Sequence, residues 1–71
     1  MLEGVIQMKK YHIEFNKKNF VIYDYEDGLR PEIFYEENNV LYDEGNGFPD
    51  ISVVDPYLYV YDNWKKLIED K

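Results

Sequence analysis

The sequence predicts a single α+β domain over residues 1–71, with an antiparallel β-sheet of four or five strands and one C-terminal helix packed on it. Short stretches rich in β-branched and aromatic residues recur along the chain, separated by turn-forming residues, which is typical of antiparallel strands. The last segment instead places apolar residues at helical spacing. A chain of 71 residues has room for one small core, and eight Tyr, four Phe and one Trp supply the large side chains that this core needs.

The first two predicted strands form a hairpin. Residues 11–15 alternate between apolar and polar side chains, which is the pattern of a half-buried strand. Residues 20–25 are rich in strong β-formers and predict the second strand. The polar stretch between them, residues 16–19, predicts a loop of about four residues.

A second hairpin is predicted further along the chain. A turn signal, Glu-Asp-Gly, occupies residues 26–28. Residues 32–36 then predict the third strand, and residues 37–39 predict a turn, because Asn tolerates a left-handed backbone. Residues 40–42 predict a short fourth strand that returns along the third.

The next segment predicts a long loop and more β-structure. Residues 43–50 contain two Gly and one Pro, which favours a loop. Residues 51–54 predict a short strand that ends at the following Asp-Pro pair. The alternation in residues 57–61, Tyr-Leu-Tyr-Val-Tyr, predicts the clearest strand in the chain, with its three Tyr on one face.

The chain ends with a predicted helix of about two turns. Asp62 or Asn63 is the expected N-cap, because its side chain can accept a hydrogen bond from an unpaired backbone N–H. Trp64, Leu67 and Ile68 then share one helical face. Because so short a helix is unstable alone, we expect it to dock on the sheet with Trp64 as its anchor.

Composition favours a cytoplasmic protein without a membrane span. The chain has no Cys and no apolar stretch near the roughly 20 residues that cross a bilayer. Its first residues lack the basic start and long apolar run of a signal peptide. Residues 1–7 are either an extension upstream of a start at Met8 or part of the first strand.

The sequence contains no pattern typical of catalysis or of cofactor or metal binding. His12 and Ser52 are the only residues of their types, and no nucleophile motif surrounds Ser52. The oxygen-rich stretch 43–50 misses the spacing of a calcium loop, since Gly45 stands where a ligand is expected. The paired carboxylates lie in predicted turns that face solvent, not in a cleft. We therefore expect neither an enzyme nor a cofactor.

Charge distribution is the strongest functional signal. The net charge is −7, and between Asn19 and Trp64 eleven acidic residues accompany one basic residue, Arg30. Like charges held this close repel one another, which lowers stability but attracts a basic partner. Direct nucleic-acid binding is disfavoured. The alternative interpretation is that the acidic residues only maintain solubility.

Tyrosine content is the second functional signal, because Tyr is enriched at protein interfaces. A Tyr face flanked by carboxylates would receive Arg and Lys side chains; the alternative is that these rings pack inside the protein. The expected partner-binding residues are Asp24, Glu26, Asp27, Glu36, Glu37, Asp43, Glu44, Tyr57, Tyr59 and Tyr61.

Two functions remain open at this level. The first is a small acidic modulator that binds the basic surface of another protein. Its concrete form is a phage or mobile-element inhibitor that mimics nucleic-acid phosphates to block a host nucleic-acid-binding protein. The second is a structural or assembly subunit that self-associates, for example as a homodimer, through a strand edge or a Tyr-rich face.

Overall fold

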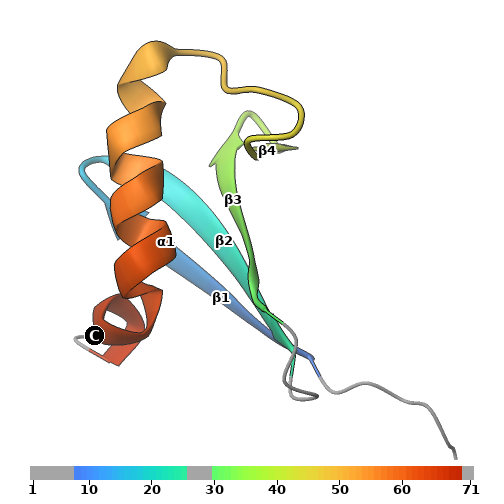
Figure 1. Cartoon of the computed structure of the whole chain (residues 1–71), viewed down its shortest axis with the longest axis vertical. Coiled ribbons are helices and arrows are strands. Elements are labelled where there is room, and N and C mark those ends of the chain that lie inside the picture. The colour runs from blue at the N-terminus through green and yellow to red at the C-terminus, as the bar shows by residue number, and fades with distance from the viewer. Residues whose placement is uncertain (1–7, 26–29, 70–71) are drawn as a thin grey trace, which may run out of the picture.

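The computed structural model describes residues 8–25 and 30–69, and it confirms the predicted α+β fold (Figure 1). A four-stranded antiparallel sheet has the order β1-β2-β3-β4, so each strand pairs with the next along the chain. The elements are β1 (Met8–Phe15), β2 (Lys18–Tyr25), β3 (Glu32–Glu37), β4 (Val40–Tyr42), a 3-10 helix (Ile51–Val53) and α1 (Val54–Glu69). The turn predicted at residues 26–28 lies outside the described residues.

Two tight turns close the hairpins. Asn16 and Lys17 join β1 to β2, and Asn38 and Asn39 join β3 to β4. All four have φ between 55° and 65°, as type I′ turns require. The predicted four-residue loop at 16–19 is therefore wrong, because a type I′ turn needs only two residues and lets β2 begin at Lys18.

The segment predicted as strands at 51–54 and 57–61 is helical, which corrects two predictions. Asp50 caps the 3-10 helix by accepting a hydrogen bond from the Ser52 N–H at 3.0 Å, and α1 follows directly. Pro56 does not break this segment, because Pro is tolerated in the first turn of a helix. Alternation over five residues misled the prediction, since the longer run of buried residues has a helical period.

The predicted helix start at Asp62 or Asn63 is wrong for the segment as a whole, because its helical residues begin at Val54, but α1 is interrupted at Asn63. Asn63 departs from helical geometry, with φ −130° and ψ 15°. Its side-chain amide donates to the Tyr59 carbonyl oxygen at 2.9 Å. Asn63 therefore marks the kink at which the two helical segments of α1 meet. The anchoring role predicted for Trp64 is confirmed, because its side chain is buried in the core.

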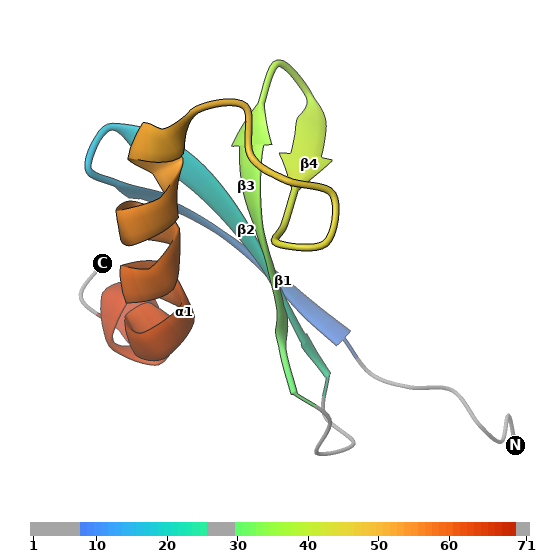
Figure 2. The same ribbon diagram turned by 45° about the horizontal axis from the view of Figure 1, so that its top comes forward.

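The core lies between α1 and one face of the sheet, and the opposite sheet face carries no described helix (Figures 1 and 2). Tyr57 and Tyr61 lie toward β3, whereas Tyr59 and Trp64 contact β1. The helix α1 therefore lies above β2, which is between these two strands. The buried core residues are Ile13, Phe20, Ile22, Ile33, Tyr35, Val53, Tyr57, Val60 and Trp64.

Candidate protein-binding site

The three tyrosines predicted to form one stripe do not share a face. Tyr57 is buried, Tyr61 is half-buried, and Tyr59 is 43% exposed. Tyr57 and Tyr61 lie together, with ring centroids 6.3 Å apart, whereas Tyr59 stacks on Phe15 of β1. The stripe is wrong because successive helical residues turn by about 100°, so positions two apart point in nearly opposite directions.

The predicted acidic residues also fall in different places. Glu26 and Asp27 lie outside the described residues. Asp24 lies near the end of β2, opposite Lys9 of β1. Neighbouring residues of a strand point to opposite faces, so Glu36 lies on the helix-free face of β3 and Glu37 on the face that α1 covers.

Four carboxylates act on two buried tyrosines: Glu37 and Asp50 on Tyr35, and Asp43 and Glu44 on Tyr57. We name the set of Tyr35, Tyr57, Glu37, Asp43, Glu44 and Asp50 the acidic–aromatic cluster. Its members come from β3, from the loop 43–50 and from α1. Sequence analysis singled out four of the six, and it missed Tyr35 and Asp50.

Negative charge in this cluster affects the pKa of Tyr35. Its hydroxyl donates to the Glu37 carboxylate at 2.5 Å. This hydrogen bond, together with burial and the negative charges of Glu37 and Asp50, raises the pKa of Tyr35 to about 12. A phenol so placed stays neutral at physiological pH and fixes the Glu37 carboxylate at the end of β3.

Negative charge also affects the pKa of Tyr57, which lies in α1. Burial is the first cause that raises its pKa to about 12, and the charges of Glu44 and Asp43 add to it. The ring of Phe48 packs on Tyr57 with centroids 4.8 Å apart, which holds the loop against the start of α1. Carboxylates that are separate in sequence therefore act on one small region.

The loop 43–50 holds its acidic residues in defined positions. The Asp43 carboxylate accepts hydrogen bonds from the N–H groups of Gly45 and Asn46, at 2.9 and 3.1 Å. The Gly47 N–H donates to the Asp43 carbonyl oxygen, and Gly47 has φ +80°, which favours glycine. Asp43 and Asp50 thus shape the backbone as well as contributing charge.

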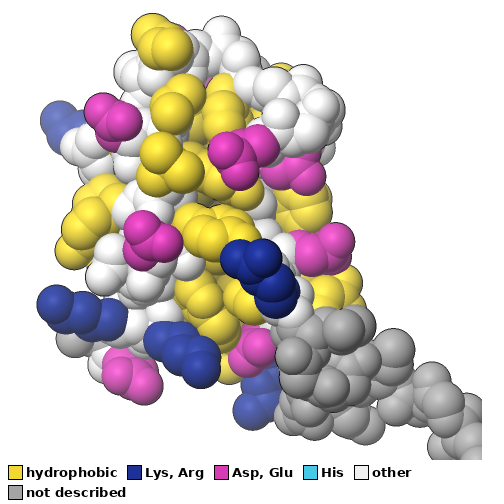
Figure 3. All heavy atoms as spheres, in the orientation of Figure 1, with side chains coloured by type: hydrophobic (Ala, Val, Ile, Leu, Met, Phe, Trp, Pro, Cys, Tyr) yellow, Lys and Arg dark blue, Asp and Glu magenta, His cyan; other side chains and the backbone are white. Residues whose placement is uncertain are grey.

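The described Lys and Arg side chains do not neutralise the negative charge of this cluster. Arg30, the one base in the central span, donates to the Tyr61 hydroxyl at 2.8 Å. Within residues 8–25 and 30–69, no ion pair joins the four cluster carboxylates to Lys or Arg. In Figure 3, Asp and Glu side chains flank exposed hydrophobic ones in the upper right of the face shown, whereas most Lys and Arg side chains lie lower.

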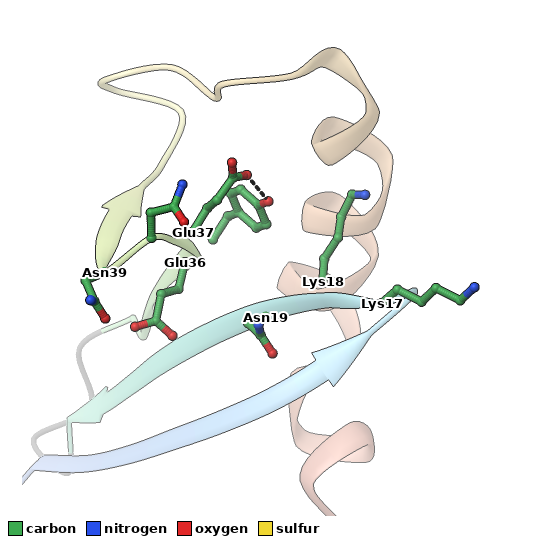
Figure 4. Close-up of a pocket in the computed structure, with 8 residues that line it drawn as sticks. Lys17, Lys18, Asn19, Glu36, Glu37 and Asn39 are labelled. Carbon is green, nitrogen blue, oxygen red and sulfur yellow. Dashed lines mark hydrogen bonds between the residues drawn. The ribbon is translucent and has the colours of Figure 1, made fainter.

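A polar groove of about 390 Å³ lies beside the cluster, between the two hairpin turns (Figure 4). Lys17 and Lys18 line one side, and Glu36 and Glu37 line the other. Figure 4 shows the two lysine side chains pointing away from these carboxylates. The groove therefore brings opposite charges into one neighbourhood without neutralising Glu37.

Comparisons with protein-family models, with curated proteins and with solved structures gave no match. Within the described part of the chain, no group of His, Asp or Glu is arranged to hold a metal ion. No described helix is long and apolar enough to cross a membrane. The functional interpretation therefore depends on the residues themselves.

Proposed function

We propose that this chain is a small acidic protein-binding modulator, and that its acidic–aromatic cluster docks on a basic surface of another protein. The proposal is supported by four carboxylates that act on two buried tyrosines and that form no ion pair with Lys or Arg within residues 8–25 and 30–69. An incoming Arg or Lys would meet a complementary potential, which accelerates association and favours basic partners over others.

The raised pKa values of two tyrosines support binding over catalysis. Within the described residues, the groups with a clearly displaced pKa are Tyr35 and Tyr57, and both pKa values are raised to about 12. A raised pKa keeps the phenols protonated at neutral pH, whereas a general base or nucleophile needs a pKa near or below the working pH. These tyrosines are suited to holding an acidic surface rigid.

The proposed partner is a nucleic-acid-binding protein of the same cytoplasm. Such a protein presents clustered Lys and Arg that normally neutralise phosphates. Carboxylates on a rigid scaffold replace those phosphates and occupy the same site. A phage or mobile-element inhibitor of a host enzyme is the concrete form of this proposal.

The test is affinity capture from a host lysate, repeated at low and high salt. The test variant, E37Q/D43N/E44Q/D50N, neutralises the four carboxylates but retains the oxygen acceptors that shape the loop and cap the 3-10 helix. The matched control, E14Q/E32Q/D62N/E69Q, removes the same charge at four other sites.

We expect the wild type and the control to capture the same basic protein at low salt and to lose it at high salt. The test variant should fail to capture this protein while keeping its wild-type circular dichroism. Equal capture by both variants would reject the cluster as the binding surface. Capture of no basic protein by the wild type would reject the modulator itself.

A further inference from the structure

The outer side of the helical segment carries exposed apolar side chains. Ile51, in the 3-10 helix just before α1, is 85% exposed, whereas no other large hydrophobic residue that the structure describes is more than 46% exposed. Leu58 is 43% exposed, and Val54 between them is half-buried. Neighbouring apolar side chains that remain in water commonly mark an interaction surface.

These three residues lie in one row along the helical segment, which we name the apolar stripe. The Val54 N–H donates to the Ile51 carbonyl oxygen, and residues three apart in a 3-10 turn point the same way. Leu58 follows Val54 by one turn of α1, so it lies on the same side. The buried residues Tyr57 and Val60 point to the sheet instead. The apolar stripe is therefore separate from the face of α1 that packs on the core.

Carboxylates lie on both sides of the apolar stripe. Because successive residues of an α-helix turn by about 100°, Asp55 and Tyr57 flank the stripe on opposite sides. Asp55 is exposed. On the other side lies the loop 43–50, whose Phe48 packs on Tyr57 and two of whose carboxylates act on it. In the upper part of Figure 3, Asp and Glu side chains lie to the left and to the right of hydrophobic ones.

Basic residues are scarce in this region. Residues 31–64 contain no Lys or Arg. Within residues 8–25 and 30–69, no ion pair joins Asp55 to a basic side chain from elsewhere in the chain. A second copy of the chain would bring two negative regions together, and their repulsion makes it a poor occupant of the stripe. A basic occupant would be attracted on both sides.

We propose that the apolar stripe binds a basic amphipathic helix of the partner protein, which packs along α1. Its apolar side chains lie on Ile51 and Leu58, and its Lys and Arg residues lie beside the flanking carboxylates. Packed helices place apolar residues between them and charged residues at the borders of the contact. This inference rests on the proposed function, because it names the element through which the basic partner binds.

Spacing and length both fit a helical occupant. Peptide helices bind through anchors at positions i, i+3 or i+4, and i+7. Ile51, Val54 and Leu58 have this same spacing, so they present a matching row of contacts. The stripe spans roughly 10 Å, which two turns of a partner helix cover. So short a contact depends on few anchors, and the loss of one should be measurable.

Fluorescence anisotropy with two labelled synthetic peptides tests the inference on the full chain. The first peptide consists of Leu and Lys, with Leu at helical spacing. The second has the same composition in an order that forms no apolar face. We expect the wild type to bind the first peptide roughly tenfold more tightly than the second. Equal binding of both peptides would mean that charge alone attracts them, and it would overturn the proposal.

Two variants of the stripe test its role directly. I51S and L58S should each weaken binding of the first peptide by roughly tenfold, because each removes an apolar anchor. Ile51 is so exposed that I51S should keep its wild-type circular dichroism.

The matched control is M8S. Met8 is 46% exposed, close to Leu58, but it begins β1, and this end of the sheet lies far from the start of α1 in Figure 1. The control should bind the first peptide like the wild type. Wild-type affinity in both I51S and L58S would overturn the proposal.

Lysate capture separates this inference from the proposed function. Normal capture by I51S/L58S, together with no capture by E37Q/D43N/E44Q/D50N, would overturn the inference and leave the proposed function standing. Absence of a basic protein in the wild-type capture would reject the proposed function, whereas the peptide titration would still decide whether the stripe binds a basic helix. Sedimentation of the wild type as a dimer and of I51S/L58S as a monomer would assign the stripe to a second copy and overturn the proposal.

Discussion

The hydroxyl of Tyr57 in α1 donates a hydrogen bond to the backbone carbonyl oxygen of Ile33 in β3, at 2.8 Å and in the buried core. These residues are 24 positions apart, so the bond ties the helix to the sheet. It also places Tyr57 among the structural residues of the core, because its ring and hydroxyl are both engaged within the protein. The carboxylates near Tyr57 therefore contribute to the proposed binding site, whereas the buried Tyr57 side chain does not contact the partner.

Removal of this hydroxyl should lower stability. We expect Y57F to decrease the free energy of unfolding by about 1 kcal/mol, since a buried acceptor loses its partner. Chemical denaturation followed by circular dichroism measures this change. The control is Y59F, because Tyr59 is exposed and packs through its ring. Equal stability of Y57F and Y59F would contradict the importance of this bond.

Alkaline pH should destabilise the protein. The pKa values of Tyr35 and Tyr57 are raised to about 12, above the value near 10 of an unfolded chain. Their stabilising contribution is therefore complete below pH 10 and is lost as the pH rises from about 10 through 12. For Tyr57 the loss is on the order of 2 kcal/mol.

Denaturation at several pH values, with tyrosinate absorbance recorded in parallel, measures this loss. Lysines also titrate in this range, so the Y35F/Y57F variant is the reference. We expect its stability to fall less steeply than that of the wild type above pH 10. Parallel curves for the two proteins would show that neither phenol has a raised pKa.

The first hairpin turn should tolerate glycine better than its native lysine. Lys17 has φ 63°, which is costly for a residue with a Cβ atom. We expect K17G to raise the free energy of unfolding by roughly 0.5–1 kcal/mol. K66G, a glycine substitution inside α1, should lower it by about 1 kcal/mol. Thermal denaturation compares both, and a destabilised K17G would argue against the type I′ turn.

Trp64 should be indispensable for the folded state. Its side chain is 8% exposed and contacts Tyr11 of β1 at a centroid distance of 6.2 Å. W64A should cost about 3–5 kcal/mol, which approaches the whole stability of a small domain. Circular dichroism and proton NMR should show a largely unfolded chain. The control L58A truncates a residue that is 43% exposed, and it should remain folded.

The two hairpins were predictable because their signals are local. Strand alternation and the Asn-containing turns act over only a few residues, so β1 to β4 follow from the sequence within a few positions. The segment 51–61 was not predictable in this way, because Tyr-Leu-Tyr-Val-Tyr satisfies a strand pattern over five residues. Its helical period appears only when Val53, Tyr57, Val60 and Trp64 are considered together.

A shorter signal in the sequence also marked the helical segment. Asp50 stands two residues before Ser52, and an Asp in this position is a common helix cap. With this cap at the start, the Asp-Pro pair belongs in a first turn rather than at the end of a strand. The predicted Tyr stripe depended on the strand period of two residues, and it is absent because residues 57–61 are helical.

The sequence alone determined the class of fold, the acidic character, the two hairpins and the role of Trp64, because composition and local patterns specify them. Only the tertiary structure decided which carboxylates lie together. Glu37 and Asp50 both act on Tyr35, and Asp43 and Glu44 act on Tyr57, whose ring packs on Phe48 of the same loop. Such contacts depend on strand register and helix docking, which bring together residues that no short stretch of sequence connects.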